Sequence, residues 1–273
     1  MDENNFLNQF VEEGFVIIKN AFAPSLIENW CQLVAALNFD RSIKLVQGNF
    51  FETDPELAFQ TVADHQILNI LERIMGPFVQ LDGLTLVIWP PSISNNTLET
   101  EISWHRDPYA NVPFSNYYCR PLAVNVLSYL QDLDDEIGPL RIIPKSHRMP
   151  FTMPVNQRSR SHPLEKLLYL KKGETIIFHN NLVHSRTPNN SSNLRGYVSV
   201  YYNLSWLRSS FYNNAIFIKN IQRRAQQNND RRISRLFGID DELENRTNSG
   251  FMSHDQECWN EWIKEDKSVI NFH

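Results

Sequence analysis

Clustered cysteines, long apolar runs and a basic amino terminus are all missing from this chain. The three cysteines, Cys31, Cys119 and Cys258, lie far apart and form no CxxC pair. Their odd number and spacing exclude a disulfide scaffold and a zinc finger and favour a reducing compartment, so we expect the cytoplasm. No apolar run approaches the roughly 20 residues that span a bilayer. The acidic segment Met1–Asn5 lacks the basic region of a signal peptide.

An excess of positive charge is also missing. Lysine and arginine number 26 against 31 aspartates and glutamates, which gives a net charge of −5. A nucleic-acid binder usually carries a basic balance or a basic stripe, so we expect no nucleic-acid partner. One local group of arginines is interpreted as a solvated helix face; its members are Arg223, Arg224, Arg231, Arg232 and Arg235.

The apolar pattern predicts a mainly β fold with flanking helices. The chain has 273 residues and is 42% hydrophobic, which suits one large domain with a sizeable core. Helical spacing of apolar residues predicts helices that begin near Pro24 and that end near Met75. Short apolar runs separated by turns predict the strands of a sandwich or barrel, at residues 14–18, 84–89, 102–107, 122–130, 140–143, 175–178 and 196–204. The tail from Trp206 onward is polar and helix-prone, and it could cover the open end of the barrel or form a surface appendage.

The run Trp104–Asp107 carries the clearest chemical signal. His105 and Asp107 are two positions apart, so on a strand they share one face. His184 follows 79 residues after His105, in another strand-to-loop setting. Two histidines and one carboxylate are the ligands that hold non-haem Fe(II) and leave positions open for reactants. Zinc tolerates the same set, and His179, which also ends a β-rich run, is a rival to His184.

Arg195 adds a second feature to this set. It lies eleven residues after His184 and shares a strand face with Tyr197, Ser199 and Tyr201. An arginine there could bind a carboxylate cosubstrate through two parallel hydrogen bonds. The ordinary alternative is a surface ion pair. A structural zinc site has no need of a carboxylate-binding arginine, so Arg195 favours the iron interpretation.

Three segments resemble the phytanoyl-CoA dioxygenase family of Fe(II)/2-oxoglutarate-dependent oxygenases. The segment Gly138–Arg148 matches the family's Gly-x-Leu-x-x-x-Pro-Gly-Ser-His pattern, apart from Lys145 in place of the second glycine. The run His184–Asn189, followed by Arg195, resembles the family's distal-ligand segment, and Glu13–Ile18 resembles its opening strand. The similarity covers about residues 10 to 204.

The resemblance implies a double-stranded β-helix core with helices along one side. It implies iron ligands at His105, Asp107 and His184, with O2 and 2-oxoglutarate as reactants. It also implies that Arg195 binds the cosubstrate's C5 carboxylate and that Asn125 lies on a strand that often supplies a second cosubstrate contact. One oxygenase domain would then span residues 1–273, with its core at about 10–204 and a helical extension at about 205–273.

The chain differs from the family pattern at two further positions and matches it at two others that bear on function. Several family members place a lysine where this chain has Trp89, and some place a tryptophan where it has Leu127. Relatives that halogenate have glycine or alanine at the position of Asp107, so the carboxylate indicates hydroxylation or a related oxidation. His147 matches the family motif, and we interpret it as a structural loop residue.

The substrate is less clearly indicated than the chemistry. We expect a small metabolite or natural-product intermediate, contacted by Tyr109 and Arg106. Arg186 and Arg208 are further candidates to meet an anionic substrate. The aromatic residues after the first ligands either form a lid over the pocket or pack the loop on the barrel; they are Tyr109, Phe114, Tyr117 and Tyr118. We expect a monomer or homodimer.

Two other functions stay open. The chain could be a non-catalytic β-barrel protein that binds metal, because zinc accepts the same ligands. It could also be an oxygenase that modifies a side chain of a partner protein. We rank the second below a small-molecule enzyme because the sequence shows no dedicated interaction domain.

Overall fold

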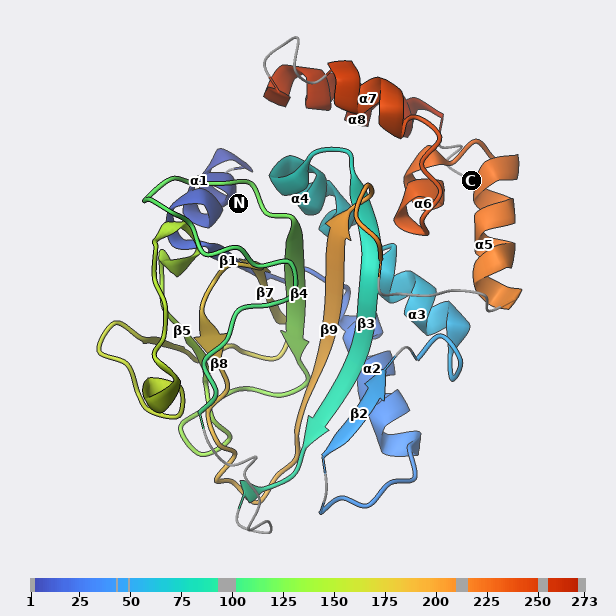
Figure 1. Cartoon of the computed structure of the whole chain (residues 1–273). Coiled ribbons are helices and arrows are strands. Elements are labelled where there is room, and N and C mark those ends of the chain that lie inside the picture. The colour runs from blue at the N-terminus through green and yellow to red at the C-terminus, as the bar shows by residue number, and fades with distance from the viewer. Residues whose placement is uncertain are drawn as a thin grey trace.

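Two antiparallel sheets lie face to face, with helices along the outer side of the larger one (Figure 1). The computed structural model describes residues 3–42, 44–48, 50–92, 102–209, 216–249 and 255–269. The larger sheet has the order β1-β7-β4-β9-β3-β2 and the smaller one β6-β5-β8. The strands are β1 Phe15–Lys19, β2 Leu45–Gly48, β3 Val79–Trp89, β4 Ala123–Tyr129, β5 Leu140–Ile142, β6 Lys166–Leu168, β7 Glu174–His179, β8 His184–Ser185 and β9 Arg195–Leu204. This architecture confirms the predicted fold class, although the sheets do not close into a barrel.

Proline and aspartate set where several helices begin. α2 and α3 start at Pro24 and Pro55, a position that needs no backbone N–H. The carboxylates of Asp54, Asp64 and Asp230 each accept the backbone N–H of the residue three positions later, at 3.0 Å, and such a cap contributes about 1 kcal/mol. The helices are α1 Glu3–Glu13, α2 Pro24–Ala36, α3 Pro55–Val62, α4 His65–Met75, α5 Ile216–Gln227, α6 Arg231–Leu236, α7 Leu243–Ser249 and α8 Asp255–Ser268. In the described residues, none of them is both long and apolar enough to cross a bilayer.

The larger sheet has a different role on each face. Along β9, Val198, Val200 and Tyr202 are buried in the main core, which lies between this sheet and the helices. The intervening residues Tyr197, Ser199 and Tyr201 point the opposite way. A second core fills the space between the two sheets at one end and is built from Phe15, Leu127, Leu140, Ile142, Ile176 and Phe178 among others. The inner face is therefore apolar at this end and carries polar side chains elsewhere.

Most predicted strands are present, and the exceptions have local causes. Residues 102–107 form no strand except for one bridge at His105. The chain turns away there because the N–H of Asp107 donates to the carbonyl of Asn180 and Pro108 has no N–H to continue a ladder. The strand β2 was not expected from the sequence; it lies at the edge of the larger sheet and exposes 52% of Val46.

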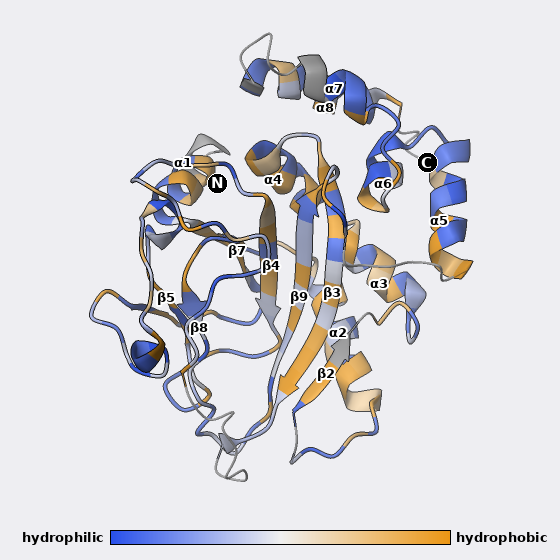
Figure 2. Cartoon of the chain, in the orientation of Figure 1, coloured by the Kyte–Doolittle hydropathy of each residue, from blue (hydrophilic) through white to orange (hydrophobic). Residues whose placement is uncertain are grey.

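The carboxy-terminal helices belong to the outer helical layer. Ile218, Leu236 and Trp259 are part of the main core, and α6 contacts β3. The indole of Trp259 lies so close to Gly76 that a Cβ there would come within 2.6 Å of the ring. Figure 1 shows α5 to α8 beside α3 and α4, away from β5 and β8. In Figure 2, α5 is hydrophilic along most of its length beyond its first turn. Of the two placements expected for the tail, the structure has neither a cover over the open end nor a loose appendage.

The interpretation of the arginine cluster as a solvated face is wrong for three of its members. Arg232 donates to Glu72 of α4 at 2.7 Å, and Arg235 donates to Asp266 of α8 at 2.8 Å. Arg231 also lies 3.3 Å from Asp266. The partner carboxylates come from distant parts of the chain, so the helix pattern alone gives no sign of them. Arg223 and Arg224 are exposed, as expected.

Asp266 is the centre of this network, and its loss should destabilise the fold. Its carboxylate is 1% exposed and accepts hydrogen bonds from Arg246, at 2.6 and 2.8 Å, as well as from Arg235. We expect Asp266→Asn to lower the free energy of unfolding by about 3 kcal/mol, because it leaves buried guanidinium groups without their counter-charge. Urea denaturation at pH 7 measures this change.

Glu265→Gln is the matched control, since the neighbouring Glu265 has an exposed side chain with one ion pair, to Arg231. It should cost less than about 1 kcal/mol. Burial alone would raise the pKa of Asp266, but hydrogen bonding to Arg246 and the charges of Arg235 and Arg246 lower it overall. The network's contribution is therefore complete above the unfolded pKa of about 3.9 and is lost as pH falls through the lower folded value. Equal effects of the two substitutions at pH 7 would contradict this account.

Candidate metal centre

Two histidines meet across an isolated β-bridge. The backbone N–H of His105 donates to the carbonyl of His184 at 3.0 Å, and the N–H of His184 donates back to His105 at 3.0 Å. The ring centroids are 4.3 Å apart. On its other side, His184 pairs with Ile142 of β5. The smaller sheet therefore brings together two imidazoles that are 79 residues apart in the sequence.

Backbone carbonyls fix the orientation of both rings. The Nδ1 atom of His105 lies 2.8 Å from the carbonyl of Ser103, and that of His184 lies 3.0 Å from the carbonyl of Leu182. A carbonyl oxygen only accepts, so each Nδ1 carries the proton and donates it. Each Nε2 then presents a lone pair. Burial is the main cause that lowers the pKa of His184, and the charge of Asp107 opposes it.

Asp107 completes the group and is held at both ends. Its backbone N–H donates to the carbonyl of Asn180 at 3.0 Å. The Oδ2 atom accepts a hydrogen bond from Asn125 Nδ2 at 3.1 Å, and Asn125 Oδ1 in turn accepts one from Ser199 at 2.7 Å. The Oδ1 atom lies 3.7 Å from Nε2 of His184. One carboxylate oxygen is thus held by protein while the other faces the imidazoles.

The donor atoms of His105, Asp107 and His184 lie within 4.8 Å of one another. In the described part of the chain, this is the one group of three or more His, Cys, Asp or Glu residues arranged to hold a metal ion. Two neutral imidazoles and one carboxylate match the donor set of a three-ligand Fe(II) site, and they occupy only part of a coordination sphere. Three residues singled out from the sequence are therefore brought to one point.

The rival histidine lies elsewhere. His179 Nε2 donates to the carbonyl of Cys119 at 2.9 Å, and its Nδ1 accepts the N–H of Asn181 at 3.0 Å. Both ring nitrogens are occupied, and burial lowers the pKa of His179 to about 3. His147 Nε2 lies 3.0 Å from the carbonyl of Val11 in α1 and its ring is buried, which fits the structural role expected from the sequence.

Arg195 begins β9 and is 3% exposed. Its Nη1 donates to the carbonyls of Thr187, Ile137 and Gly138 at 2.6, 3.1 and 3.1 Å. Its Nε is buried and makes no hydrogen bond in the described structure. No carboxylate of the described residues forms an ion pair with it, so the expected alternative of a surface ion pair does not hold. One edge of the guanidinium is fixed by backbone, and the Nε edge remains for another acceptor.

The departures from the family pattern have visible consequences. Trp89 carries two cations, with Lys44 Nζ 4.0 Å and the Arg186 guanidinium 3.9 Å from its ring. Leu127 lies in the core between the sheets. Lys145 keeps a left-handed backbone with φ of 65°, a conformation that favours glycine. Its ammonium pairs with Glu12 at 2.8 Å, which offsets part of that strain.

The two expected substrate contacts differ in the structure. The guanidinium of Arg106 donates to the backbone carbonyls of Ser146, Asn181 and Phe151. These bonds hold the surrounding loops. Arg106 also lines a cavity of about 310 Å³ together with His105, so its role in substrate binding stays a prediction. Tyr109 lines a cavity of about 490 Å³ in the loop after the metal ligands, and its hydroxyl donates to the carbonyl of Arg208 at 2.7 Å.

The aromatic residues of this loop divide into two kinds. Phe114 and Tyr117 line the same cavity and expose most of their surface to solvent. Tyr118 packs edge-on against His147 and His179, and burial raises its pKa to about 12. Packing therefore describes Tyr118, whereas a lid role for Phe114 and Tyr117 stays a prediction.

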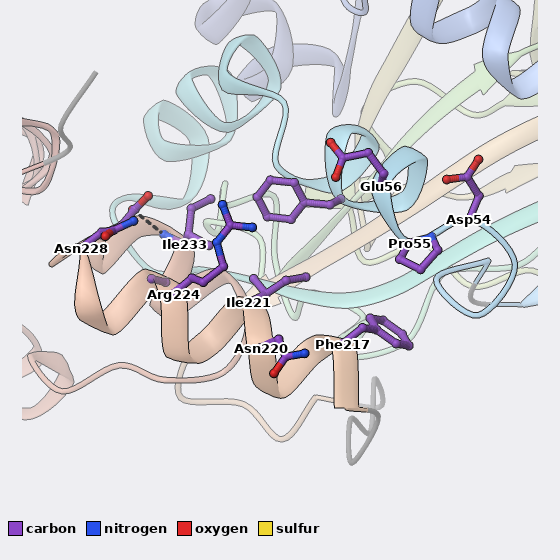
Figure 3. A pocket seen from close by; sticks show the side chains of 12 residues that line it. Asp54, Pro55, Glu56, Phe217, Asn220, Ile221, Arg224, Asn228 and Ile233 are labelled. Carbon is purple, nitrogen blue, oxygen red and sulfur yellow. Dashed lines mark hydrogen bonds between the residues drawn. The ribbon is translucent and has the colours of Figure 1, made fainter. Parts of the chain in front are cut away.

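Another cavity, of about 530 Å³, lies between α3 and α5–α6. Figure 3 shows its walls, with Pro55 and Glu56 from α3 opposite Ile221 and Arg224 from α5. It shares no residue with the metal cluster. Of its three acidic residues, Asp54 and Asp230 cap helices and Glu56 accepts a hydrogen bond from Gln60, and in the described residues they form no metal-binding group.

A family model described as phytanoyl-CoA dioxygenase (PhyH) matches residues 10–197. The chain belongs to this family. The match contains the three clustered side chains and Arg195, and it ends inside β9. A search of curated proteins finds no match to this chain.

Solved structures with the same fold are distant in sequence. HygX from Streptomyces hygroscopicus, solved with nickel, 2-oxoglutarate and hygromycin B, has a TM-score of 0.63 at 14% identity, covering 75% of this chain and 88% of its own. SnoN, an α-ketoglutarate-dependent epimerase from nogalamycin biosynthesis, has a TM-score of 0.59 at 16% identity, covering 74% and 81%. The carbocyclase SnoK of the same pathway has a TM-score of 0.53 at 17% identity, covering 74% and 83%. Identities this low show a shared fold.

Asn125 provides a test of how the cluster is held. We expect Asn125→Leu to bind Mn(II) about 10-fold or more weakly, because Asp107 loses the hydrogen bond that orients it. Isothermal titration under anaerobic conditions measures the affinity. Ser128→Ala is the matched control, since Ser128 lies on the opposite face of β4 and bonds Thr175 instead. Unchanged Mn(II) affinity in Asn125→Leu would show that Asp107 does not need this support.

Proposed function

We propose that this chain is an Fe(II)- and 2-oxoglutarate-dependent oxygenase. The observation that carries the proposal is the convergence of the His105, Asp107 and His184 donors within 4.8 Å. The buried Arg195 and membership of the phytanoyl-CoA dioxygenase family support it. Bound Fe(II) would supply the chemistry that couples O2 to the oxidation of 2-oxoglutarate and of a second substrate.

Each protein group would have a distinct task at the metal. His105 and His184 would hold the ion through Nε2, and their Nδ1 hydrogen bonds keep the rings from rotating. Asp107 would bind through Oδ1 while Asn125 retains Oδ2. The ring of Phe178, from the opposite sheet, lies 4.7 Å from that of His184 and places an apolar wall beside the centre. Such a wall excludes water from the reacting groups.

Arg195 would bind the distal carboxylate of 2-oxoglutarate. Its Nη1 is fixed by three carbonyls, so the Nε edge is held in one direction before the cosubstrate arrives. Burial strengthens the attraction between this guanidinium and a carboxylate relative to the same pair in water. Pre-set orientation of the cosubstrate is the protein's main contribution to such a reaction.

We propose hydroxylation of an unactivated carbon in a small metabolite or natural-product intermediate. The carboxylate of Asp107 fills the third protein position, where halogenating relatives have a small residue. SnoN and SnoK are described as an epimerase and a carbocyclase, so this fold also accommodates other outcomes. HygX was solved with hygromycin B, which supports a small-molecule substrate as a working class. Product analysis by mass spectrometry distinguishes a gain of one oxygen from a loss of two hydrogens.

The first test uses the spectrum of the anaerobic complex. Fe(II) and 2-oxoglutarate added to the protein should give a weak visible charge-transfer band, because the chelated cosubstrate accepts charge from the ion. Oxygen should then produce succinate. Arg195→Met should weaken 2-oxoglutarate binding by about 10-fold or more, since a charge-assisted carboxylate pair is lost. A featureless spectrum with intact metal binding would favour the alternative of a non-catalytic metal-binding protein. Succinate formed only with protein substrates would favour the alternative of a protein-modifying oxygenase.

Gly138 provides a second test of the cosubstrate site. It has φ of +91°, and a Cβ there would lie 2.8 Å from Arg195 Nη1 and 2.5 Å from the carbonyl oxygen of Pro188. We expect Gly138→Ala to displace the guanidinium and weaken 2-oxoglutarate binding about 10-fold or more, with Mn(II) affinity unchanged. Titration of the charge-transfer band measures the first quantity and calorimetry the second.

Gly173→Ala is the matched control for backbone strain. Gly173 also has φ of +91°, but its nearest contact for a Cβ is Ile27, at 3.7 Å. It should lose stability by about 1 kcal/mol without any change in 2-oxoglutarate affinity. Equal effects of the two substitutions on 2-oxoglutarate binding would contradict the role assigned to Gly138.

A further inference from the structure

The cavity of about 310 Å³ that includes His105 borders the candidate metal centre from the outer side of the smaller sheet. Its walls are largely apolar, and they include Trp104, Phe151, Met153 and Val183. Trp104 and Val183 each precede a histidine of the metal cluster, so their side chains turn to the opposite face, where they pack with Ile143. The cavity therefore lies against the outer face of this sheet and meets the cluster at His105.

The charge along this cavity is positive. Arg106 and Arg158 line it, and no aspartate or glutamate does. Arg106 donates to three backbone carbonyls, which orient its guanidinium without neutralising it. The side chain of Arg158 forms no ion pair with the described residues. Residues 137–164 include five lysines and arginines and no acidic residue, although the whole chain has a net charge of −5. A cavity lined by one sign of charge attracts a ligand of the other sign, here an anion.

Trp104 fixes the turn that carries Arg158. The tryptophan is 2% exposed, and its backbone N–H donates to the carbonyl of Arg158 at 3.0 Å. Its indole Nε1 donates to the carbonyl of Arg160 at 2.8 Å. The short helix η4 Val155–Gln157 ends at Arg158, whose N–H donates to the carbonyl of Val155 at 3.3 Å. The residue next to the His105 ligand thus holds the turn, so the backbone sets where Arg158 lies relative to the metal centre.

Apolar side chains are exposed on both loops beside the cavity. Val112 lines it and is 44% exposed, and Val155, three residues before Arg158, is 80% exposed. Exposed aliphatic groups next to an arginine suit a ligand that has an apolar body and a charged end. The volume is at the lower end of the range for small-molecule sites, about 300–1,000 Å³. A ligand enclosed here is therefore small.

We propose that this cavity takes the second substrate of the oxygenase, a small apolar molecule with one anionic group, and that Arg158 binds that group. The inference rests on the proposed function. A guanidinium binds a carboxylate or a phosphate through two parallel hydrogen bonds. The apolar body packs against Trp104 and Phe151 and extends toward His105. Arg158 is then a specificity-determining residue, and it was not among the arginines that the sequence suggested for an anionic substrate.

The experiment measures the binding of three probe anions by anaerobic calorimetry, with Mn(II) in place of Fe(II). Octanoate, 4-phenylbutyrate and hexyl phosphate are each compared with a neutral counterpart, namely octanamide, 4-phenylbutanamide and hexanol. Saturating 2-oxoglutarate occupies the metal and Arg195, so the probe anions do not bind there. The variants are Arg158→Met and Arg158→Lys. Arg223 is exposed on α5 and lies outside the cavity, so Arg223→Met is the matched control for loss of one positive charge.

We expect wild type to bind at least one of the anions with a Kd of about 1 mM or lower, and its neutral counterpart about 10-fold more weakly. Arg158→Met should raise the Kd of that anion about five- to tenfold, because an exposed guanidinium contributes less than a buried one. The Kd of the neutral counterpart should change less than about twofold. Arg158→Lys should give an intermediate Kd, since it keeps the charge without the planar fork. Arg223→Met should match wild type.

A second measurement tests whether the bound anion reaches the metal centre. The anion that binds in calorimetry is added to the anaerobic complex with Fe(II) and 2-oxoglutarate. We expect the charge-transfer band to shift in wild type, because His105 belongs to both the cavity and the metal cluster. The shift should be smaller in Arg158→Met at the same concentration of anion.

Three results would overturn the inference. If none of the three anions binds, the cavity takes no ligand of this class. If Arg158→Met weakens anions and neutral counterparts equally, Arg158 supports the cavity wall and does not recognise charge. If binding depends on Arg158 but leaves the band unchanged, the ligand is not the second substrate. Absence of the band without any probe would instead remove the proposed function, and calorimetry would still decide whether Arg158 binds an anion.

Discussion

One reciprocal pair of backbone hydrogen bonds, between His105 and His184, sets the geometry on which the site depends. It joins the first-ligand segment to β8, and it holds the two rings with their centroids 4.3 Å apart. The carbonyl two residues before each histidine accepts the Nδ1 proton and orients the ring. Nε2 is therefore the nitrogen that faces the centre in both histidines. Asp107 is placed in the same manner, through its N–H and the carbonyl of Asn180. Ligands fixed this way need little reorganisation when an ion binds, which favours tight and selective binding.

Sequence patterns predicted the parts of this structure that are local. Short apolar runs between turns marked β4 and β9. The His-x-Asp spacing did pick out two residues of the cluster, although hydrogen bonds to His184 and Asn180 place them there and not a regular strand. The choice of His184 over His179 depended on the spacing between His184 and Arg195 and on the family resemblance, since both histidines end β-rich runs. The role of Asn125 at Asp107 could not be predicted, because it depends on how a loop crosses β4. The burial of Arg232 and Arg235 was missed for the same reason, as their carboxylate partners are more than 30 residues away.

Some arginines with restricted exposure pair with carboxylates, and others donate only to neutral carbonyls. This difference distinguishes arginines that hold the fold from one that could bind an anion. Arg232 and Arg235 face carboxylates, so their charge is already compensated. Arg106 donates to neutral carbonyls, and burial lowers its pKa to about 10. It remains protonated at neutral pH, but its hydrogen bonds are directed into the loops it holds. Arg195 is also bonded to carbonyls, yet its Nε edge is unused in the described structure. Of these four arginines, only Arg195 has both an uncompensated charge and an N–H, at Nε, that could donate to an incoming anion.

Residues of the carboxy-terminal extension contact the loop that follows the metal ligands. Tyr109, two residues after the Asp107 ligand, has φ of 60°, a conformation that costs about 1 kcal/mol or more in a non-glycine residue. Its hydroxyl donates to Arg208, and Tyr201 donates to Pro108, so the segment around the end of β9 holds this strained turn. Arg120, in the same loop, stacks on Trp259 of α8 at 3.8 Å. The family match ends at residue 197, so Arg208 and Trp259 lie outside it. The loop after the metal ligands is therefore held partly by residues that lie beyond the family match, so the shared metal centre alone does not define the shape of this loop.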